Sequence, residues 1–492
     1  MLTVAIFLPL IGAIAIAALP QARATSARWM ALAVASGPLA IMAVAWTRFR
    51  GGTGFDLVER VEWIPTLGVS YAVGVDGISL PLAAMTALVF LAAVAYPFDT
   101  QGRPRAYFAL VLFLEAASLG LFLALDLFLF YVFFDVSLVG MYFLIAGWGH
   151  GDARRSALKF FIYTLAGSLV MLLAILGLYL ATDPRTFDMA AIIANPPLPA
   201  GGAASTLIFF GFFLGFGVKT PLVPFHTWLP PAHVDAPAPA SAILAGVLLK
   251  MGTYGLIRIP LQMMPSTFQR FADIVIIVAV VSIVYGALVA LAQTNLKRLI
   301  AYTSINHMGY AVLGVGAAAA VGDGNARTLA LTGATLEMVA HGLITGTLFL
   351  LAGSVLARTG SYEMDELGGL AARAPAFTAA TAVAAFASLG LPGLAGFVAE
   401  FQIFAGALAV RPVLAGIGLL GIVITAALFL RMLQQVLLGP LPPQLGGWPD
   451  LGGAEKVVVG ALLAFVVLIG VAPGWLLEVI DGAAGAIVRA VG

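Results

Sequence analysis

The chain has 492 residues, of which 62% are hydrophobic and only 10% are charged, and its formal net charge is +1. A soluble protein carries about 25% charged residues, so the composition predicts an integral membrane protein, and the near-zero net charge gives no reason to expect nucleic acid as a partner. Because cysteine is absent, a disulfide framework, thiolate-bound iron–sulfur clusters and a cysteine zinc site are excluded.

Apolar stretches long enough to cross a bilayer follow one another along nearly the whole chain. About 20 apolar residues span the ~30 Å hydrocarbon core. This length predicts about fourteen spans, near residues 2–19, 28–46, 77–96, 106–125, 127–147, 157–181, 206–229, 240–258, 271–292, 297–318, 328–356, 376–409, 413–437 and 456–480. The first lacks the basic start and cleavage site of a secretory signal, so we expect a retained helix.

The distribution of Lys and Arg predicts the orientation. Fourteen spans place both chain ends on one side of the membrane. The loops after odd-numbered spans hold 13 basic residues, against 9 on the opposite side. Because cytoplasmic loops are enriched in Lys and Arg, both termini are expected on the non-cytoplasmic side.

Two carboxylates are predicted at similar depth in neighbouring spans. Glu115 and Asp135 flank the turn near residues 125–126, each about ten residues away, which corresponds to a depth of ~15 Å along a helix. Such a pair can share a proton or hold a cation nearby. The alternative is that one of them is a neutral, hydrogen-bonded structural acid.

Two lysines lie within spans, where a charge costs roughly 2.5–3.5 kcal/mol even on insertion scales. Lys219 is followed by Pro221 and Pro224, which predict a broken helix. Lys250 lies in an apparently straight span without an acid of its own. Buried lysines of this kind can take up and release protons, although Lys219 could instead form a static ion pair that closes the broken helix.

Several histidines lie at transmembrane positions. His307 and His341 belong to spans ten and eleven, and His226 follows the two prolines. Histidine can relay protons near neutral pH, whereas a single buried histidine is often only a core residue. Glu337 precedes His341 by one turn and could simply pair with it. No close-spaced ligand pair suggests a metal.

The twelfth span is interrupted by Leu-Gly-Leu-Pro-Gly at residues 389–393, with Pro392 inside the break and Glu400 after it. Irregular backbone at this depth is tolerated when it lines a wet cavity or is buried in protein. We therefore expect the helix to unwind near Leu391–Gly393 and Glu400 to lie in the interior. Spans four to eight and nine to thirteen each have a break in their fourth member, as in inverted repeats of transporters.

Six stretches resemble the antiporter-like membrane subunits of respiratory NADH–quinone oxidoreductase, complex I. They are YAVGVDGISLPL (71–82), ALDLFLFYVFFDVSLVGMYFLI (124–145), VKTPLVPFHTWLPPAH (218–233), LAGVLLKMGTYG (244–255), NLKRLIAYTSINHMGY (295–310) and GFVAEF (396–401). The first and fourth favour the subunit M group within this family, whose mitochondrial counterpart is chain 4.

The resemblance implies an all-α, polytopic protein of about fourteen helices with two inverted five-helix repeats. The expected divisions are 1–105 for helices one to three, 106–262 and 271–437 for the repeats, and 438–492 for the last helix. It also implies proton translocation by an acid in span five, lysines in spans seven and eight, and an acid in span twelve. These positions match Asp135, Lys219, Lys250 and Glu400, with Glu115, His226, His307, His341 and Glu337 as a supporting relay.

The resemblance also implies partners and a location. No cofactor is expected in this chain, and flavin, iron–sulfur clusters and quinone belong to partner subunits. Those partners are other membrane-arm subunits, including further antiporter-like ones, together with lipids of a bacterial inner membrane. Energy must then reach this chain through conformation or a line of charges.

Some positions depart from the family pattern, which leaves alternatives open. Asp135 replaces the usual glutamate and is one methylene shorter, and Glu337 replaces a neutral residue. A direct ion pair between Asp135 and Lys219 is nevertheless expected. The alternatives are a cation/proton antiporter subunit of the same superfamily and a structural paralogue that no longer pumps.

Overall fold

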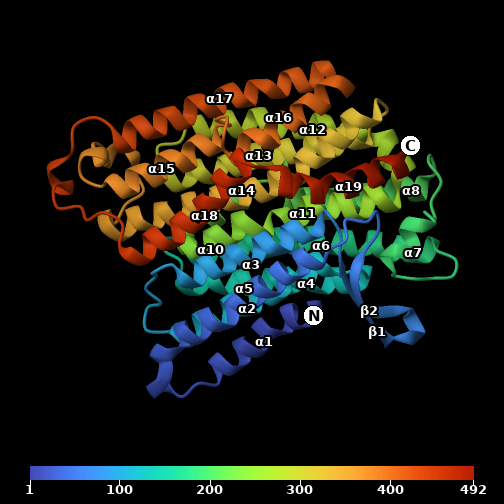
Figure 1. Cartoon of the computed structure of the whole chain (residues 1–492), viewed down its shortest axis with the longest axis horizontal. Helices are drawn as coiled ribbons and strands as arrows, with labels where there is room; N and C mark the ends of the chain where they lie inside the picture. Colours follow the sequence, from blue (N-terminus) through green and yellow to red (C-terminus); the bar gives the residue numbers. More distant parts are fainter.

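The chain folds as a bundle of helices that run side by side (Figure 1). This computed structural model describes residues 1–492, apart from the side chain of residue 22. Among the described residues, nine helices are long and apolar enough to cross a membrane, and five further apolar helices have 10–17 residues. The expected all-α, polytopic membrane protein is therefore confirmed at this level.

The first quarter of the chain combines four helices with a small hairpin. Its elements are α1 (Leu2–Ala17), α2 (Ala27–Arg48), β1 (Asp56–Ile64), β2 (Val69–Val75), α3 (Ser79–Ala95) and α4 (Pro104–Leu123). The strands are antiparallel, with Val61 opposite Tyr71. This hairpin is absent from the expectation for residues 47–76, and it projects from the same end of the bundle as the C-terminus (Figure 1).

The next part contains the first broken helix. It comprises α5 (Leu127–Trp148), α6 (Ala153–Ala181), α7 (Met189–Ala194), α8 (Ala203–Lys219), α9 (Leu229–Asp235), α10 (Ala238–Ile243) and α11 (Lys250–Leu256). The predicted break after Lys219 is confirmed, because residues 220–228 form turns. The span around Lys250 is one helical segment, Ala238–Leu261, in which π-helical stretches at Leu244–Leu248 and Ile257–Leu261 flank α11.

The second half contains the other broken helix. It comprises α12 (Pro265–Leu291), α13 (Leu296–Ala319), α14 (Gly324–Thr359), α15 (Pro375–Ser388), α16 (Ala395–Val410), α17 (Pro412–Leu437), α18 (Gly453–Val471) and α19 (Gly474–Val491). The predicted interruption of span twelve is confirmed between α15 and α16. The predicted boundary of the last span, 456–480, is wrong, because the chain leaves the helix before Pro473 and α19 then begins.

The centre of the bundle is formed by Ala238–Leu261 and α14. Every residue in the apolar window of Ala238–Leu261 is buried, as is 94% of that of α14, against 33% for α17. Peripheral helices such as α17 therefore present apolar side chains to lipid. The two central segments carry Lys250 and His341, so these polar groups lie far from the lipid-facing surface.

Candidate functional site

Lys250 lies at the start of α11, two residues after the end of the first π-helical stretch, and its side chain is fully buried. Its Nζ donates to the carbonyl oxygen of Ala245 and lies 2.6 Å from Nδ1 of His341 in α14. Among the described residues, no carboxylate lies within 4.0 Å of this ammonium group. Because an ammonium can donate to a neutral imidazole while two cations would repel, the pair can share one proton.

A second histidine and a carboxylate lie beyond His341. The ring centroids of His341 and His307 are 5.5 Å apart, and His307 Nε2 lies 3.8 Å from Glu400 Oε1. His307 Nδ1 and Nε2 each lie 2.8 Å from a carbonyl oxygen, of Thr303 and Ser388 respectively. A neutral imidazole has only one N–H, so a neutral His307 can donate to one of these two carbonyls at a time.

Glu400 packs against the break between α15 and α16. Gly390, inside this break, has φ +77°, and a Cβ there would lie 2.5 Å from Glu400 Oε2. The position therefore needs glycine both for its left-handed backbone and for the space that the carboxylate occupies. Glu400 is only 4% exposed, which confirms its predicted interior location. A cavity of about 350 Å³ adjoins it, lined by Phe397, Phe401 and Phe404 among others.

Glu337 lies between the two ends of this line. It precedes His341 by one helical turn in α14, is buried, and has one carboxyl oxygen, Oε2, without a hydrogen-bond partner. It is close enough to Lys250 and to Glu400 to interact with both charges. Lys250, His341, His307, Glu337 and Glu400 therefore form one continuous buried set of titratable groups.

Lys219 and Asp135 do not form the predicted ion pair. Among the described residues, no salt bridge within 4.0 Å joins them. The Lys219 ammonium instead lies 3.5 Å from Ser137 Oγ and 4.8 Å from the centre of the Phe134 ring. Asp135 is half-buried, and its Oδ1 has no hydrogen-bond partner. The two charges still interact at longer range, and Tyr131 neighbours the carboxyl one turn earlier.

The break after Lys219 is held in place by polar contacts. Trp228 Nε1 donates to the Val218 carbonyl at 2.9 Å, which satisfies one of the free carbonyls at the end of α8. The Val223 N–H donates to Ser282 Oγ of α12 at 3.0 Å. The segment that contains Pro221 and Pro224 is therefore ordered by α8 and α12.

The structure places two other predicted residues apart from the central set. Glu115 is completely buried in α4, and neither carboxyl oxygen has a hydrogen-bond partner among the described residues. His226 lies in the break, where its ring packs against Tyr285 at 5.0 Å. No hydrogen bond joins Glu115 to Asp135.

Lys297 is a buried titratable residue that sequence reasoning counted only as a loop charge. It lies at the start of α13 and donates to the carbonyls of Ala236, at 2.5 Å, and Val234, at 3.3 Å. A cation at the end of α9 is favoured by the helix dipole. Its place two residues after Asn295, which caps α13, gives no sign of burial.

A second polar cluster near Lys297 joins the loop between α5 and α6 to the end of α9. His150 Nδ1 lies 2.9 Å from the Asp235 carbonyl oxygen, and Ser156 Oγ donates to Asp235 Oδ2 at 2.5 Å. Burial lowers the pKa of His150, and the charge of Lys297 lowers it further, although Asp235 acts in the opposite direction. Among the described residues, no group of three or more His, Cys, Asp or Glu could hold a metal ion.

The family that matches the chain is described as NADH:quinone oxidoreductase/Mrp antiporter, transmembrane, and it matches residues 124–425. This segment is more than half of the chain and includes Asp135, Lys219, Lys250 and Glu400. The chain belongs to this family. The family segment also contains both helix breaks and the complete line from Lys250 to Glu400.

Known proteins similar to this chain extend the similarity to nearly its whole length. It is 38% identical to NAD(P)H-quinone oxidoreductase chain 4 1 of Nostoc sp. over 98% of this chain and 89% of the relative. It is 40% identical to chain 4 1 of Synechococcus sp. over 96% of this chain and 90% of the relative. The family subunit is thus a homologue of chain 4.

Solved structures agree with the fold of this family subunit. It superposes on a chain of respiratory complex I from Thermus thermophilus with a TM-score of 0.90 and 32% identity, covering 100% of both chains. It also superposes on a chain of the Mrp complex from Dietzia sp. with a TM-score of 0.86, covering 100% of this chain and 98% of the other. At 23% identity, the second match speaks for the fold alone.

Proposed function

We propose that this chain is a proton-translocating, antiporter-like membrane subunit of complex I. It couples NAD(P)H:quinone electron transfer elsewhere in the complex to proton movement through its own side chains. Membership of the family and homology to chain 4 support this assignment. The observation that carries it is the buried line of Lys250, His341, His307 and Glu400, because a row of titratable groups inside a membrane protein indicates a proton path.

The proposed architecture is that of an inverted-repeat transporter. Fourteen spans are divided into residues 1–105, a first repeat at 106–262, a second repeat at 271–437 and a final segment at 438–492. The broken helices α8–α9 and α15–α16 occupy equivalent fourth positions, which supports the repeat. Lys250 then lies where the two repeats meet, since its partner His341 belongs to the second.

The proposed cycle begins at Asp135 and Lys219. Burial disfavours the charged form of a lysine, and a nearby carboxylate favours it, so approach and separation of the two groups would load and release a proton. That no salt bridge joins Asp135 to Lys219 in the structure supports a cycle in which the two groups separate. Movement of the segment with Pro221 and Pro224 would change this distance, and His226 would assist from the same segment.

The released proton passes to Lys250 and then along the second repeat. His341, Glu337 and His307 carry it to Glu400, beside the break that contains Pro392. Glu115 supports the charge balance of the first repeat from α4. No redox step is assigned to this chain, so flavin, iron–sulfur clusters and quinone would lie in partner subunits.

The proposed setting is the inner membrane of a bacterial cell, with both termini on the non-cytoplasmic side. The excess of basic residues in the loops after odd-numbered spans supports this orientation. Partners are the other membrane-arm subunits, including further antiporter-like ones. Membrane lipids cover the remaining apolar surface.

Proton pumping per electron in membrane vesicles tests the proposal. Lys250→Ala should lower this ratio while the complex assembles on native gels and still reduces quinone. Arg154→Ala, a change at an exposed position, is the matched control and should pump normally. A ratio unchanged in Lys250→Ala would favour a structural role, and loss of pumping only on removal of Na⁺ would favour a cation/proton antiporter.

A further inference from the structure

A large groove separates α15 from α18 on the surface of the bundle. Its volume is about 820 Å³, within the range of roughly 300–1,000 Å³ that ligand pockets show. The walls carry small residues, including Ala376, Ala379, Gly460 and Ala464, and Lys456 lines one end. A Cβ added to Gly460 would have no other atom within 4 Å, so this glycine faces the open groove.

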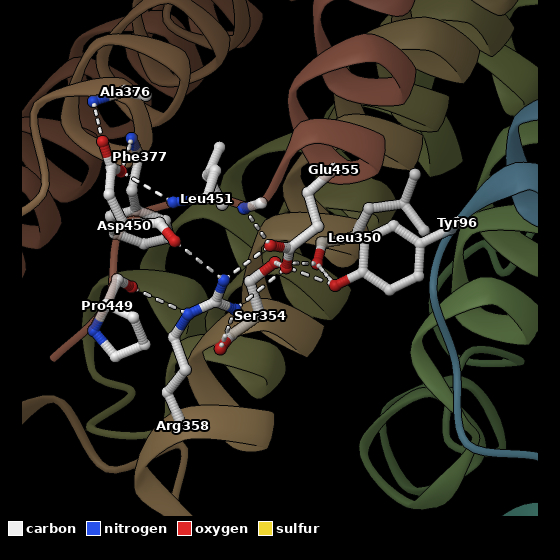
Figure 2. Close-up of polar contacts among 11 residues, drawn as sticks. Tyr96, Leu350, Ser354, Arg358, Ala376, Phe377, Pro449, Asp450, Leu451 and Glu455 are labelled. Carbon is white, nitrogen blue, oxygen red and sulfur yellow. Dashed lines mark hydrogen bonds and ion pairs between the residues drawn. The ribbon is translucent and has the colours of Figure 1, made fainter.

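The groove is fixed at the end near Lys456 by a polar network that Figure 2 shows. The Asp450 carboxylate accepts hydrogen bonds from the backbone N–H groups of Ala376, at 3.0 Å, and Phe377, at 2.9 Å, at the start of α15. Arg358 of α14 contacts both carboxyl oxygens of Glu455, at 2.9 Å and 2.5 Å. The beginnings of α15 and α18 are therefore both anchored.

The other end of the groove is fixed by backbone contact. A Cβ on Gly470 of α18 would lie 2.2 Å from the Gly393 carbonyl oxygen and 2.3 Å from Leu394 Cα. The end of α18 therefore already touches the break that follows α15. Because both ends are anchored, the two helices cannot close the groove by moving together.

We propose that this groove binds one acyl chain of an anionic phospholipid, with the phosphate group at Lys456. The groove walls are apolar apart from this lysine, and at membrane depth lipid rather than water is the available solvent. Lys456 is exposed, as is Arg373, three residues before Ala376. Basic residues at the cytoplasmic ends of transmembrane helices attract anionic head groups, each contributing about a fivefold increase in affinity.

The dimensions favour an acyl chain over a partner helix. A helix 18 residues long and about 10 Å wide occupies on the order of 2,000 Å³, well above the volume of the groove. An acyl chain in the groove would pack against α15 and support this helix. The C-terminal end of α15 leads to Gly390, which lies against Glu400. The lipid site stands independently of the proposed proton path, because it rests only on α15, α18 and their anchors.

Photo-crosslinking in the intact complex tests this site. Phosphatidylglycerol with a diazirine in its acyl chain is added to the detergent-purified complex, and peptides carrying lipid are mapped by mass spectrometry. The expected adducts lie in residues 376–383 and 456–472. Gly460→Leu should lower the yield of lipid adducts about tenfold, because the leucine blocks the contact of about two methylene groups with the groove. Lys456→Gln should lower the yield of adducts about fivefold.

Matched controls separate this result from general damage. Gly416 in α17 also has no atom within 4 Å of a Cβ, so Gly416→Leu should leave the adducts unchanged, as should Arg154→Gln. Equal labelling in Gly460→Leu and Gly416→Leu would overturn the proposal. Gly460→Cys offers a second test, because the chain has no other cysteine: a photoreactive label there that captures a partner subunit instead of phospholipid would also overturn it.

Discussion

Lys250 Nζ lies 2.6 Å from His341 Nδ1, in the most deeply buried part of the bundle. Two bases in direct contact can hold one excess proton between them, whereas two charged forms would repel. In the proposed path, the proton therefore leaves Lys250 toward a neutral His341 and passes from His341 to His307. This contact makes the side chains of α11 and α14 a single proton-carrying unit in the proposed path.

Replacement of Lys250 should reduce pumping more than assembly. Lys250→Ala removes the carrier but leaves an apolar helix, and proton transfer by a positioned side chain contributes about 10²–10⁴-fold to a rate. Coupled proton transfer should therefore fall by at least about 100-fold. The measurement is proton uptake by inverted vesicles during NAD(P)H oxidation.

Lys250→Arg separates carrying a proton from supplying a charge. The guanidinium keeps its proton at accessible pH, so this variant should pump little even if it assembles normally. Full pumping by the Arg variant would show that Lys250 acts only as a fixed positive charge. Equal quinone reduction by both variants in uncoupled vesicles would exclude a defect in electron transfer.

The distance between Asp135 and Lys219 should set the efficiency of the proposed first step. Asp135→Asn removes the negative charge and should cut pumping by about tenfold or more. Asp135→Glu keeps the charge and extends the side chain toward Lys219, so it should pump at least as well as the natural chain. Proton-to-electron ratios would decide, and an Asn variant that pumps fully would remove Asp135 from the path.

The sequence predicts most of the helices because lipid imposes a simple length rule. The break between α15 and α16 is equally predictable, since Gly390, Pro392 and Gly393 cannot continue a regular helix. The π-helical stretches around α11 are not, because Gly246 and Gly252 are compatible with a straight helix. Their origin lies in tertiary contacts, such as the approach of Gly342 to the Gly246 backbone.

The site is predictable in its members but not in its contacts. Charged residues in apolar stretches identify Lys219, Lys250 and Glu400, because charge at that depth is costly. Equal depth along two helices did not bring Asp135 to Lys219, since depth does not determine the direction of a side chain around the helix. The burial of Lys297 could not be predicted, because a lysine beside a helix cap has the same sequence pattern whether its side chain is exposed or buried.

Gly252 should be essential for the packing of α11 against the first helix break. A Cβ there would lie 2.2 Å from Thr220 Oγ1 and 2.6 Å from the Phe216 carbonyl oxygen. Gly252→Ala should therefore destabilise the subunit by about 1–3 kcal/mol through overpacking. Gly416→Ala is the control and should be neutral or slightly stabilising. Thermal unfolding of the two variants gives the comparison, and equal stability would contradict the close approach.

Asp450 should anchor α15 in a pH-dependent manner. Burial raises the pKa of the Asp450 carboxyl. Hydrogen bonds from the backbone N–H groups of Phe377, Ala376 and Leu451 and the charge of Lys456 lower it, and their combined effect is larger, so the pKa lies below its ordinary value. A depressed carboxyl pKa stabilises the folded state fully above the ordinary value, about 3.9, and this stabilisation is lost as the pH falls through the lower folded-state value. Acid should therefore loosen the start of α15.

Hydrogen exchange of residues 375–388 measures this effect. Asp450→Ala should reduce protection near Ala376 and Phe377 by the value of a helix cap, about 0.5–2 kcal/mol. The difference between the natural chain and the variant should be constant from pH 7 to about 4 and should shrink at lower pH, after correction for the intrinsic exchange rate. Asp450→Asn keeps an acceptor oxygen and should retain most of the protection at neutral pH. A difference that grows as the pH falls would contradict the assigned role, because a protonated Asp450 has less to lose than an ionised one.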